Sequence, residues 1–301
     1  MFTNVRSYHP TTGSAILICC TFLSQCAGYD AWKSTEELQK LVVARFEDPK
    51  DCKSLHRENR IWINRDEQLV VLDGYIVQRD VPLELFACPA GTKEHEAVVA
   101  VFSRAQLVHA GLLAINAQPG STAAFDPFKA AHGTTIRVYA LWLDADGNPK
   151  GTLAQNWIRK TGSKKSMHWD WVFAGSKIFK DDEGKERYLG DSGELISVSN
   201  FSTSTMDVAV RSEQSNANLI FEAFAERIPP KNTPVRLVLT LTDEAPYGNS
   251  QTEDDTQEPK HLSAKVPDNI MALLVPKSAA IAKDNASETK TPKSPQPNSK
   301  K

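Results

Sequence analysis

The sequence predicts an α+β protein: a single strand-rich domain with one main helix, flanked by a signal segment and a disordered tail. Short runs of β-branched and aromatic residues outnumber helical patterns in the middle of the chain. An uncharged apolar run lies near the N-terminus, and the C-terminal part is rich in Pro, Ser, Asn and Lys. We therefore expect a signal peptide over 1–28, a helical lead-in over 29–55, the α+β domain over 56–243 and a low-complexity tail over 244–301.

The bulk composition is that of an ordinary globular protein. The chain has 301 residues, of which 41% are hydrophobic and 24% are charged, so it can form one sizeable core. Its formal net charge is −2, and it has no general basic excess that would neutralise nucleic-acid phosphates. We therefore expect no nucleic-acid partner.

The N-terminus has the pattern of an export signal. Arg6 precedes the apolar run 15–23, which has the length of a signal-peptide core and is shorter than the roughly 20 apolar residues of a membrane-spanning helix. The run ends in Leu-Ser-Gln-Cys, which resembles a bacterial lipobox with Cys26 as the lipidated residue, although Gln25 stands where a small residue is usual. Ordinary cleavage after Gly28 is the alternative. The protein is thus predicted to be exported, either periplasmic or held at the membrane by a lipid.

Two segments have helical spacing. In the first, Ser34 and Glu37 have the spacing of a capping box, and Pro49 ends the pattern. We interpret this helix as a lead-in outside the core. The main helix is expected over 103–116, where Ser103 and Gln106 give a second capping-box spacing.

Most of the remaining pattern predicts strands. The Asp-Gly pair at 73–74 is compatible with either a tight turn or a bulge in one long strand. The short apolar stretch 218–225 favours a helix, and 271–275 is the one part of the tail with enough apolar residues to dock. Strands are expected at 61–63, 69–77, 83–88, 97–102, 135–143, 169–179, 187–189, 194–198 and 235–241.

A cluster of charged residues before the strand at 97–102 is the principal candidate site. Glu94, His95 and Glu96 offer imidazole and carboxylate groups, which are adequate ligands for zinc and other divalent transition metals. His109 on the following helix is the natural further ligand, with His168 and Asp170 as later contributors. Acid–base catalysis by His95 with a neighbouring carboxylate is a second hypothesis. In the third, these charges only pair with one another at the end of a strand.

Two cysteines remain beyond the N-terminal segment. In an oxidising compartment Cys52 and Cys88 would either form a disulfide or stay as buried free thiols, and their spacing does not decide between the two. A redox role for Cys88 would require an exposed thiol near a positive group.

Several short motifs follow one another along the chain: CP at 88–89, KEHE at 93–96, VV at 98–99, VHAGLL at 108–113, WVFAGS at 171–176, VSNF at 198–201, FEA at 221–223 and ERIPP at 226–230. Together they resemble a known family, the YdjY-type domain found in exported proteins of planctomycetes. The resemblance covers roughly residues 60 to 241, and it implies no activity that can be carried over to this chain. An iron–sulfur cluster is not supported, because four clustered cysteines are absent.

The sequence therefore predicts an exported cell-envelope protein that acts as a binding or structural module. Its expected partner is an unidentified envelope component, and its contact with the membrane is expected only through an N-terminal lipid. The motifs of serine hydrolases and of P-loop nucleotide-binding proteins are absent. Two alternatives remain: a metal-dependent envelope enzyme centred on His95 and His109, and a redox protein that uses Cys88.

Overall fold

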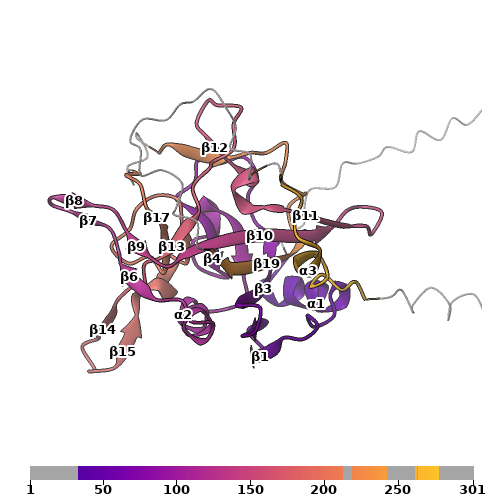
Figure 1. Ribbon diagram of the computed structural model, residues 1–301, viewed down its shortest axis with the longest axis horizontal. Helices are drawn as coiled ribbons and strands as arrows, with labels where there is room; N and C mark the ends of the chain where they lie inside the picture. Colours follow the sequence, from indigo (N-terminus) through magenta and orange to yellow (C-terminus); the bar gives the residue numbers. More distant parts are fainter. Residues whose placement is uncertain (1–32, 213–218, 243–261, 263, 278–301) are drawn as a thin grey trace, which may run out of the picture. The chain divides into compact units, whose positions relative to one another are not determined.

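Eight strands form one closed sheet in the computed structural model (Figure 1), which describes residues 33–212, 219–242, 262 and 264–277. The predicted signal peptide, Cys26 and most of the predicted tail lie outside the described residues. Around the closed sheet the strands follow the order β3 Leu69–Ile76, β19 Pro234–Leu241, β10 Thr135–Leu143, β13 Trp171–Phe173, β17 Met206–Val208, β16 Ile196–Ser197, β4 Leu85–Pro89 and β5 Ala97–Val101. The strands β1 Lys53–His56 and β2 Ile61–Asn64 extend it beyond β3, and β11 Pro149–Leu153 pairs with β10. The predicted strand-rich domain is confirmed, whereas its closure was not predicted.

The sheet closes because β3 changes its partner half-way along. Leu72 pairs with β2, whereas Gly74 pairs with Val101 of β5. A side chain at Gly74 would overlap the carbonyl of Ala100, so glycine is what allows β5 to come this close. The pairing of β3 with β19 continues through Asp73 and Gly74 without a register shift, so this pair forms neither a turn nor a bulge.

The first core fills the inside of the closed sheet. Each of the eight strands contributes at least one buried side chain, such as Val70, Trp171 and Leu239. The helix α2 Ala105–Ala114 packs Val108 and Leu112 into the same cluster. Alternate residues on these strands face the core, as the period of two predicts.

A second core lies on the opposite face of β2, β3, β10 and β19. The helix α1 Thr35–Arg45 and the residue after it cover this face with Leu38, Val42 and Phe46. The capping box of Ser34 and Glu37 is present as predicted. The interpretation of this helix as a lead-in outside the core is wrong, because its apolar stripe is buried against the sheet.

The segment around α3 Asp268–Met271 completes the second core. Ile270, Leu273 and Leu274 are buried there, so the predicted docking of 271–275 is confirmed. The backbone beyond α3 runs antiparallel to the end of α1: Glu47 N–H donates to Val275 O at 2.9 Å, and Lys277 N–H donates to Arg45 O at 2.9 Å. The two flanks of the domain therefore form one continuous cover, which we call the strap (34–48 and 264–277).

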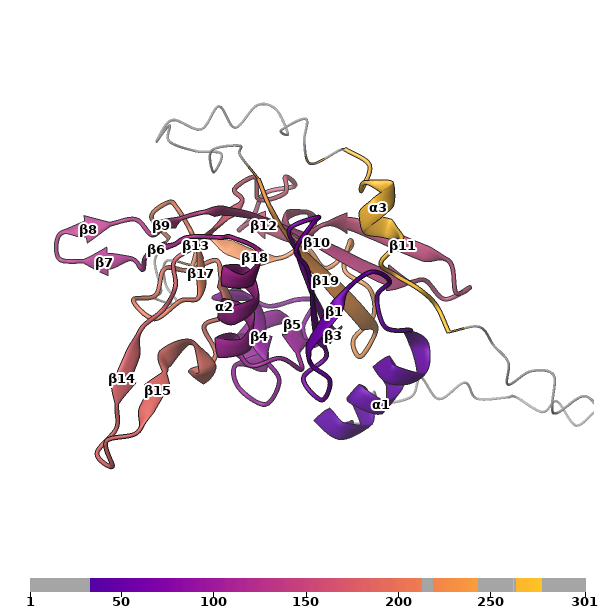
Figure 2. The same cartoon turned by 60° about the horizontal axis from the view of Figure 1, so that its bottom comes forward.

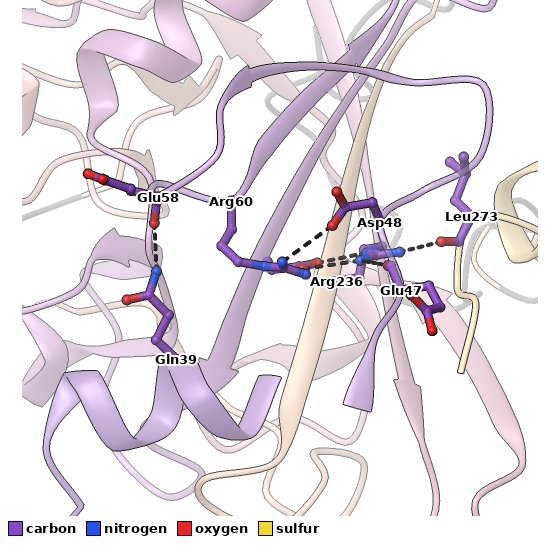
Figure 3. Close-up of polar contacts among 8 residues, drawn as sticks. Gln39, Glu47, Asp48, Glu58, Arg60, Arg236 and Leu273 are labelled. Atoms are coloured by element: carbon purple, nitrogen blue, oxygen red, sulfur yellow. Dashed lines mark hydrogen bonds and ion pairs between the residues drawn. The ribbon is translucent and has the colours of Figure 1, made fainter. Parts of the chain in front are cut away.

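A buried charge cluster joins the strap to the sheet (Figure 3). Asp73 of β3 accepts hydrogen bonds from Arg60, with Nη2 at 2.5 Å, and from Arg236 of β19, with Nε at 2.7 Å. Arg236 also donates to the carbonyls of Leu273 at 2.5 Å and of Glu47 at 2.9 Å. Because Asp73 and Arg236 are fully buried, each charge depends on these partners for the hydrogen bonds that water would supply.

The main helix begins one residue later than its capping pattern suggested. Its N-cap is Arg104, which makes no side-chain capping bond, and the hydroxyl of Ser103 donates to the carbonyl of Arg104. The carboxylate of Asp191 accepts from the Gln106 N–H at 3.0 Å and pairs with Arg104. The prediction of a capping box at Ser103 is therefore wrong: a residue distant in sequence caps this helix.

Two short hairpins, at 124–129 and 178–188, project from the body of the domain in Figures 1 and 2. The predicted strand 169–179 is divided between β13 and the hairpin strand β14 Ile178–Lys180. The predicted helix at 218–225 is wrong: Phe221 and Ala223 are buried at alternate positions of a strand that pairs with β12 Ile158–Lys160. The remaining short strands are β6 Pro119–Ser121 with β9 His132–Gly133, β7 Ala124–Phe125 with β8 Phe128–Lys129, β12 Ile158–Lys160 with β18 Phe221–Ala223, and β14 Ile178–Lys180 with β15 Glu186–Tyr188. Among the described residues, no helix has the length and apolar character needed to cross a membrane.

Candidate functional site

The charged cluster singled out by sequence lies on the connection between two parallel neighbours, β4 and β5. The chain leaves β4, turns at Gly91 with φ of 82°, and forms the single 3-10 turn η1 Glu94–Glu96 before β5 begins. Because η1 is a turn and not an extended segment, its side chains do not alternate between two faces. We call this region, together with the side chains that contact it, the rim cluster: Glu84, Lys93, Glu94, His95, Glu96 and Glu194.

Glu94 holds the connection in place. Its Oε1 accepts from the Gly91 N–H at 2.8 Å and from the Tyr75 hydroxyl of β3 at 2.8 Å. Burial and the adjacent carboxylate raise the pKa of Tyr75, so the phenol stays protonated and donates to Glu94. Glu94 is thus committed to shaping the connection.

Lys93 bridges two carboxylates from different parts of the chain. Its Nζ lies 2.9 Å from Glu194 and 3.4 Å from Glu96, and 4.8 Å from the ring centroid of Phe201. Partial burial acts to lower the pKa of Lys93, but the two carboxylates outweigh it and the net pKa is raised. The ammonium group is therefore fixed between η1 and the segment before β16.

The sequence analysis missed two members of the rim cluster. Glu84, just before β4, lies beside Glu96, and burial together with that neighbouring carboxylate raises its pKa. Glu194 accepts from Lys93 and from the Ser192 hydroxyl at 2.9 Å. A signal for Glu84 existed, since it is the only charged residue in the apolar run 83–88. Glu194 reaches the cluster through tertiary contacts that no local pattern shows.

His95 is the member most open to solvent. Its side chain is 76% exposed, and its Nε2 lies 3.7 Å from Glu96. An imidazole beside a partly exposed carboxylate can hydrogen-bond to a polar group of a ligand.

His109 lies in a different environment, against β13 and β15. Its ring packs edge-on against Phe173 and Tyr188, and its Nδ1 is 3.0 Å from the Tyr188 hydroxyl. Tyr188 is in turn 3.0 Å from the Thr205 hydroxyl and donates to Gly175 O at 3.2 Å. Burial lowers the pKa of His109 and raises that of Tyr188 to about 12. His109 is thus part of a packed hydrogen-bond network.

The predicted metal ligands are not brought together. Among the described residues, no three or more His, Cys, Asp or Glu side chains form a group that could hold a metal ion, and this includes Glu94, His95, Glu96 and His109. Of the later contributors, Asp170 pairs with Arg137 at 2.7 Å and accepts from Gln155 at 2.7 Å. The ring of His168 packs on Trp169 with centroids 4.0 Å apart.

The two cysteines of the domain are unpaired in the structure. Cys88 is fully buried, which raises its pKa to about 12, and partial burial raises the pKa of Cys52 to about 11. The structure therefore holds two free thiols where a disulfide was one of the alternatives. A buried, protonated Cys88 lacks the exposure that the redox hypothesis required.

The chain matches a known protein family. The family model of the YdjY domain matches residues 61–240, more than half of the chain. No curated protein and no solved structure matches.

Proposed function

The chain belongs to the YdjY domain family, and from this membership and the geometry of the rim cluster we propose that it is a non-catalytic binding or structural module of the cell envelope. The observation that carries the proposal is that the charges of the rim cluster are engaged within the domain. Glu94 is held by Tyr75 and Gly91, and Glu96 and Glu194 share Lys93.

This arrangement fits a contact surface better than a catalytic one. A general acid or base needs a side chain free to exchange a proton with a substrate in a defined position. In the rim cluster the most available group is His95, which stands on a solvent-exposed turn beside Glu96. We expect His95 and Glu96 to be the part of the cluster that contacts an envelope component.

Export is part of the same proposal. The support is the apolar run 15–23 after Arg6, followed by the lipobox-like Cys26. The protein would then be periplasmic, or held at the membrane by a lipid on Cys26. Intact-mass spectrometry of the protein from a bacterial envelope tests this: a diacylglyceryl adduct on Cys26 or an N-terminus at residue 29 is expected, and an intact N-terminus would contradict export.

The first experiment is the metal content of residues 29–301, purified without a histidine tag and measured by mass spectrometry. The His95→Ala variant is measured beside it, and His132→Ala serves as a control at another exposed histidine. We expect no stoichiometric transition metal in any of the three proteins and unchanged folding. Near-stoichiometric metal that is lost in His95→Ala but kept in His132→Ala would overturn the proposal in favour of a metal-dependent enzyme.

Binding is measured separately by co-sedimentation with isolated, protein-stripped cell envelopes. The wild type should sediment with the envelopes, and His95→Ala and Glu96→Gln should reduce the bound fraction while His132→Ala leaves it unchanged. Equal sedimentation of all variants would show that the rim cluster is not the contact surface.

A further inference from the structure

We propose that the outer edge of β14 is a docking strand for an extended segment of a partner polypeptide, in which acidic residues flank an apolar pair. This edge belongs to the projecting hairpin β14–β15 and includes no residue of the rim cluster. The inference is therefore independent of the function proposed above.

The hairpin exposes large apolar side chains of a kind that a folded domain usually buries. Ile178 is 63% exposed, the highest value among the large hydrophobic residues that the structure describes, and the adjacent Phe179 is 44% exposed. Neighbouring strand residues point to opposite faces, so both faces of β14 are apolar. Figures 1 and 2 both show the hairpin extending away from the closed sheet. Exposed apolar side chains of this kind mark interaction sites.

The backbone of β14 has hydrogen-bonding groups directed away from its partner strand. Leu189 N–H donates to Lys177 O at 2.9 Å, and Asp181 N–H donates to Lys185 O at 3.0 Å. In an antiparallel pair the inward-bonding residues alternate, so Ile178 and Lys180 direct their N–H and C=O groups outward. Within the described part of the chain, β14 pairs only with β15. An extended peptide can use this edge by β-strand addition.

The edge is held in place before any partner arrives. At the tip, Asp181 accepts from the Lys185 N–H at 2.9 Å and from Arg187 Nε at 2.7 Å. At the base, Tyr188 is buried in the network with His109, and Ser176 Oγ accepts from the Gly190 N–H at 2.9 Å. A strand that is already ordered loses little conformational entropy on binding.

The charges at the two ends of the edge select the partner. Lys177 and Lys180 are exposed, and neither has an ion pair among the described residues, although Lys180 is in register with Glu186. A second copy pairing antiparallel through the same edge must set outward-directed residues opposite one another, such as Ile178 opposite Lys180, and this leaves Lys180 beside an apolar side chain. Acidic residues opposite Lys177 and Lys180 would instead form cross-strand pairs. The favoured occupant is therefore an acidic–apolar–apolar–acidic segment of another protein.

The test uses a defined peptide, acetyl-Thr-Glu-Val-Ile-Glu-Thr-amide, labelled for fluorescence anisotropy, and its counterpart with lysines in place of the glutamates. The wild type should bind the acidic peptide at least about tenfold more tightly than the basic one. The double variant K177E/K180E should reverse that preference. Equal affinity of the wild type for both peptides, or no binding of either, would overturn the proposal.

Ile178→Pro separates edge pairing from general stickiness. It removes an outward N–H and leaves the inward hydrogen bonds of the hairpin, and proline is accepted at such edge positions. Binding should fall at least about tenfold, whereas Ile178→Ala should retain most of it. Circular dichroism and thermal unfolding check that both variants fold. Undiminished binding by a folded Ile178→Pro would place the peptide elsewhere.

Hydrogen exchange supplies a readout that does not depend on variants. The acidic peptide should slow the exchange of the outward amides of Ile178 and Lys180, while Phe179 is already protected by β15. No change at these two amides would overturn the assignment. A dimer in sedimentation velocity that Ile178→Pro dissolves would also overturn it, because the occupant would then be a second copy.

Discussion

The molecule contains two bridging cations whose chemistry is similar and whose surroundings differ. Arg236 joins Asp73 to the carbonyls of Glu47 and Leu273 in the second core, where it is fully buried. Lys93 joins Glu96 to Glu194 in the rim cluster, where water still reaches the group. A charge without water must be satisfied by the fold alone, whereas a charge at the surface can exchange its partners. Arg236 is therefore expected to maintain the structure, and of these two cations only Lys93 lies where a ligand could compete for its ion pairs.

The largest loss of stability is expected from removing the buried cation. Arg236→Met keeps much of the volume but leaves Asp73 with Arg60 as its remaining cation and strips two strap carbonyls of their donor. Loss of one partner from a buried ion pair destabilises by about 3–5 kcal/mol. Urea unfolding at neutral pH measures the change. A loss below about 1 kcal/mol would show that water enters the second core and replaces the guanidinium.

The matching change at the surface should be smaller. Lys93→Met leaves Glu96 and Glu194 without their shared cation, but solvent can screen both carboxylates. We expect a destabilisation of about 1 kcal/mol by the same urea titration. If Lys93→Met and Arg236→Met prove equally damaging, the proposed distinction between a structural and an exchangeable cluster is wrong.

The smallest expected effect is a change in how the free energy of unfolding of the rim cluster variant depends on pH. The pKa of Glu84 is raised from its ordinary value of 4.5 by burial and by Glu96. A carboxyl with a raised folded-state pKa contributes stability that is complete below its ordinary pKa and is lost as the pH rises through the raised value. Glu84→Gln should therefore flatten the decline of unfolding free energy above pH 4.5, and the exposed control Glu58→Gln should not. Parallel pH profiles for the wild type and Glu84→Gln would contradict the assignment.

Local sequence patterns predicted where helices and strands form better than they predicted which strands pair. The β-branched and aromatic residues of 61–63 and the mostly apolar run 235–241 correctly predicted strands, and the spacing of Ser34 and Glu37 correctly predicted a capping box. Local patterns did not predict that the sheet closes, because closure depends on the close approach of Gly74 to Ala100 in another segment of the chain. The stretch 218–225 was predicted as a helix from its local composition, and that prediction is wrong because its pairing with β12 outweighs the local preference.

The candidate site shows the same division. The sequence located the charged connection and its exposed histidine, but it joined His109 to them by chain proximity alone. In the fold, His109 turns towards Phe173 and Tyr188, while Glu84 and Glu194 complete the cluster from the segments that precede β4 and β16. Residue type indicated where charge gathers. Only the arrangement of the strands decides which charges meet.

The strap has a practical consequence for where this protein can be truncated. The segment that defines the family ends before α3 and begins after α1, yet Phe46 and Leu273 from those flanks cover one face of its sheet. A family boundary drawn from sequence is therefore not a folding boundary here. A fragment cut at 61 and 240 would leave apolar positions such as Trp62 and Val71 without their cover and Asp73 without Arg60, so the smallest expressible unit should include both flanks.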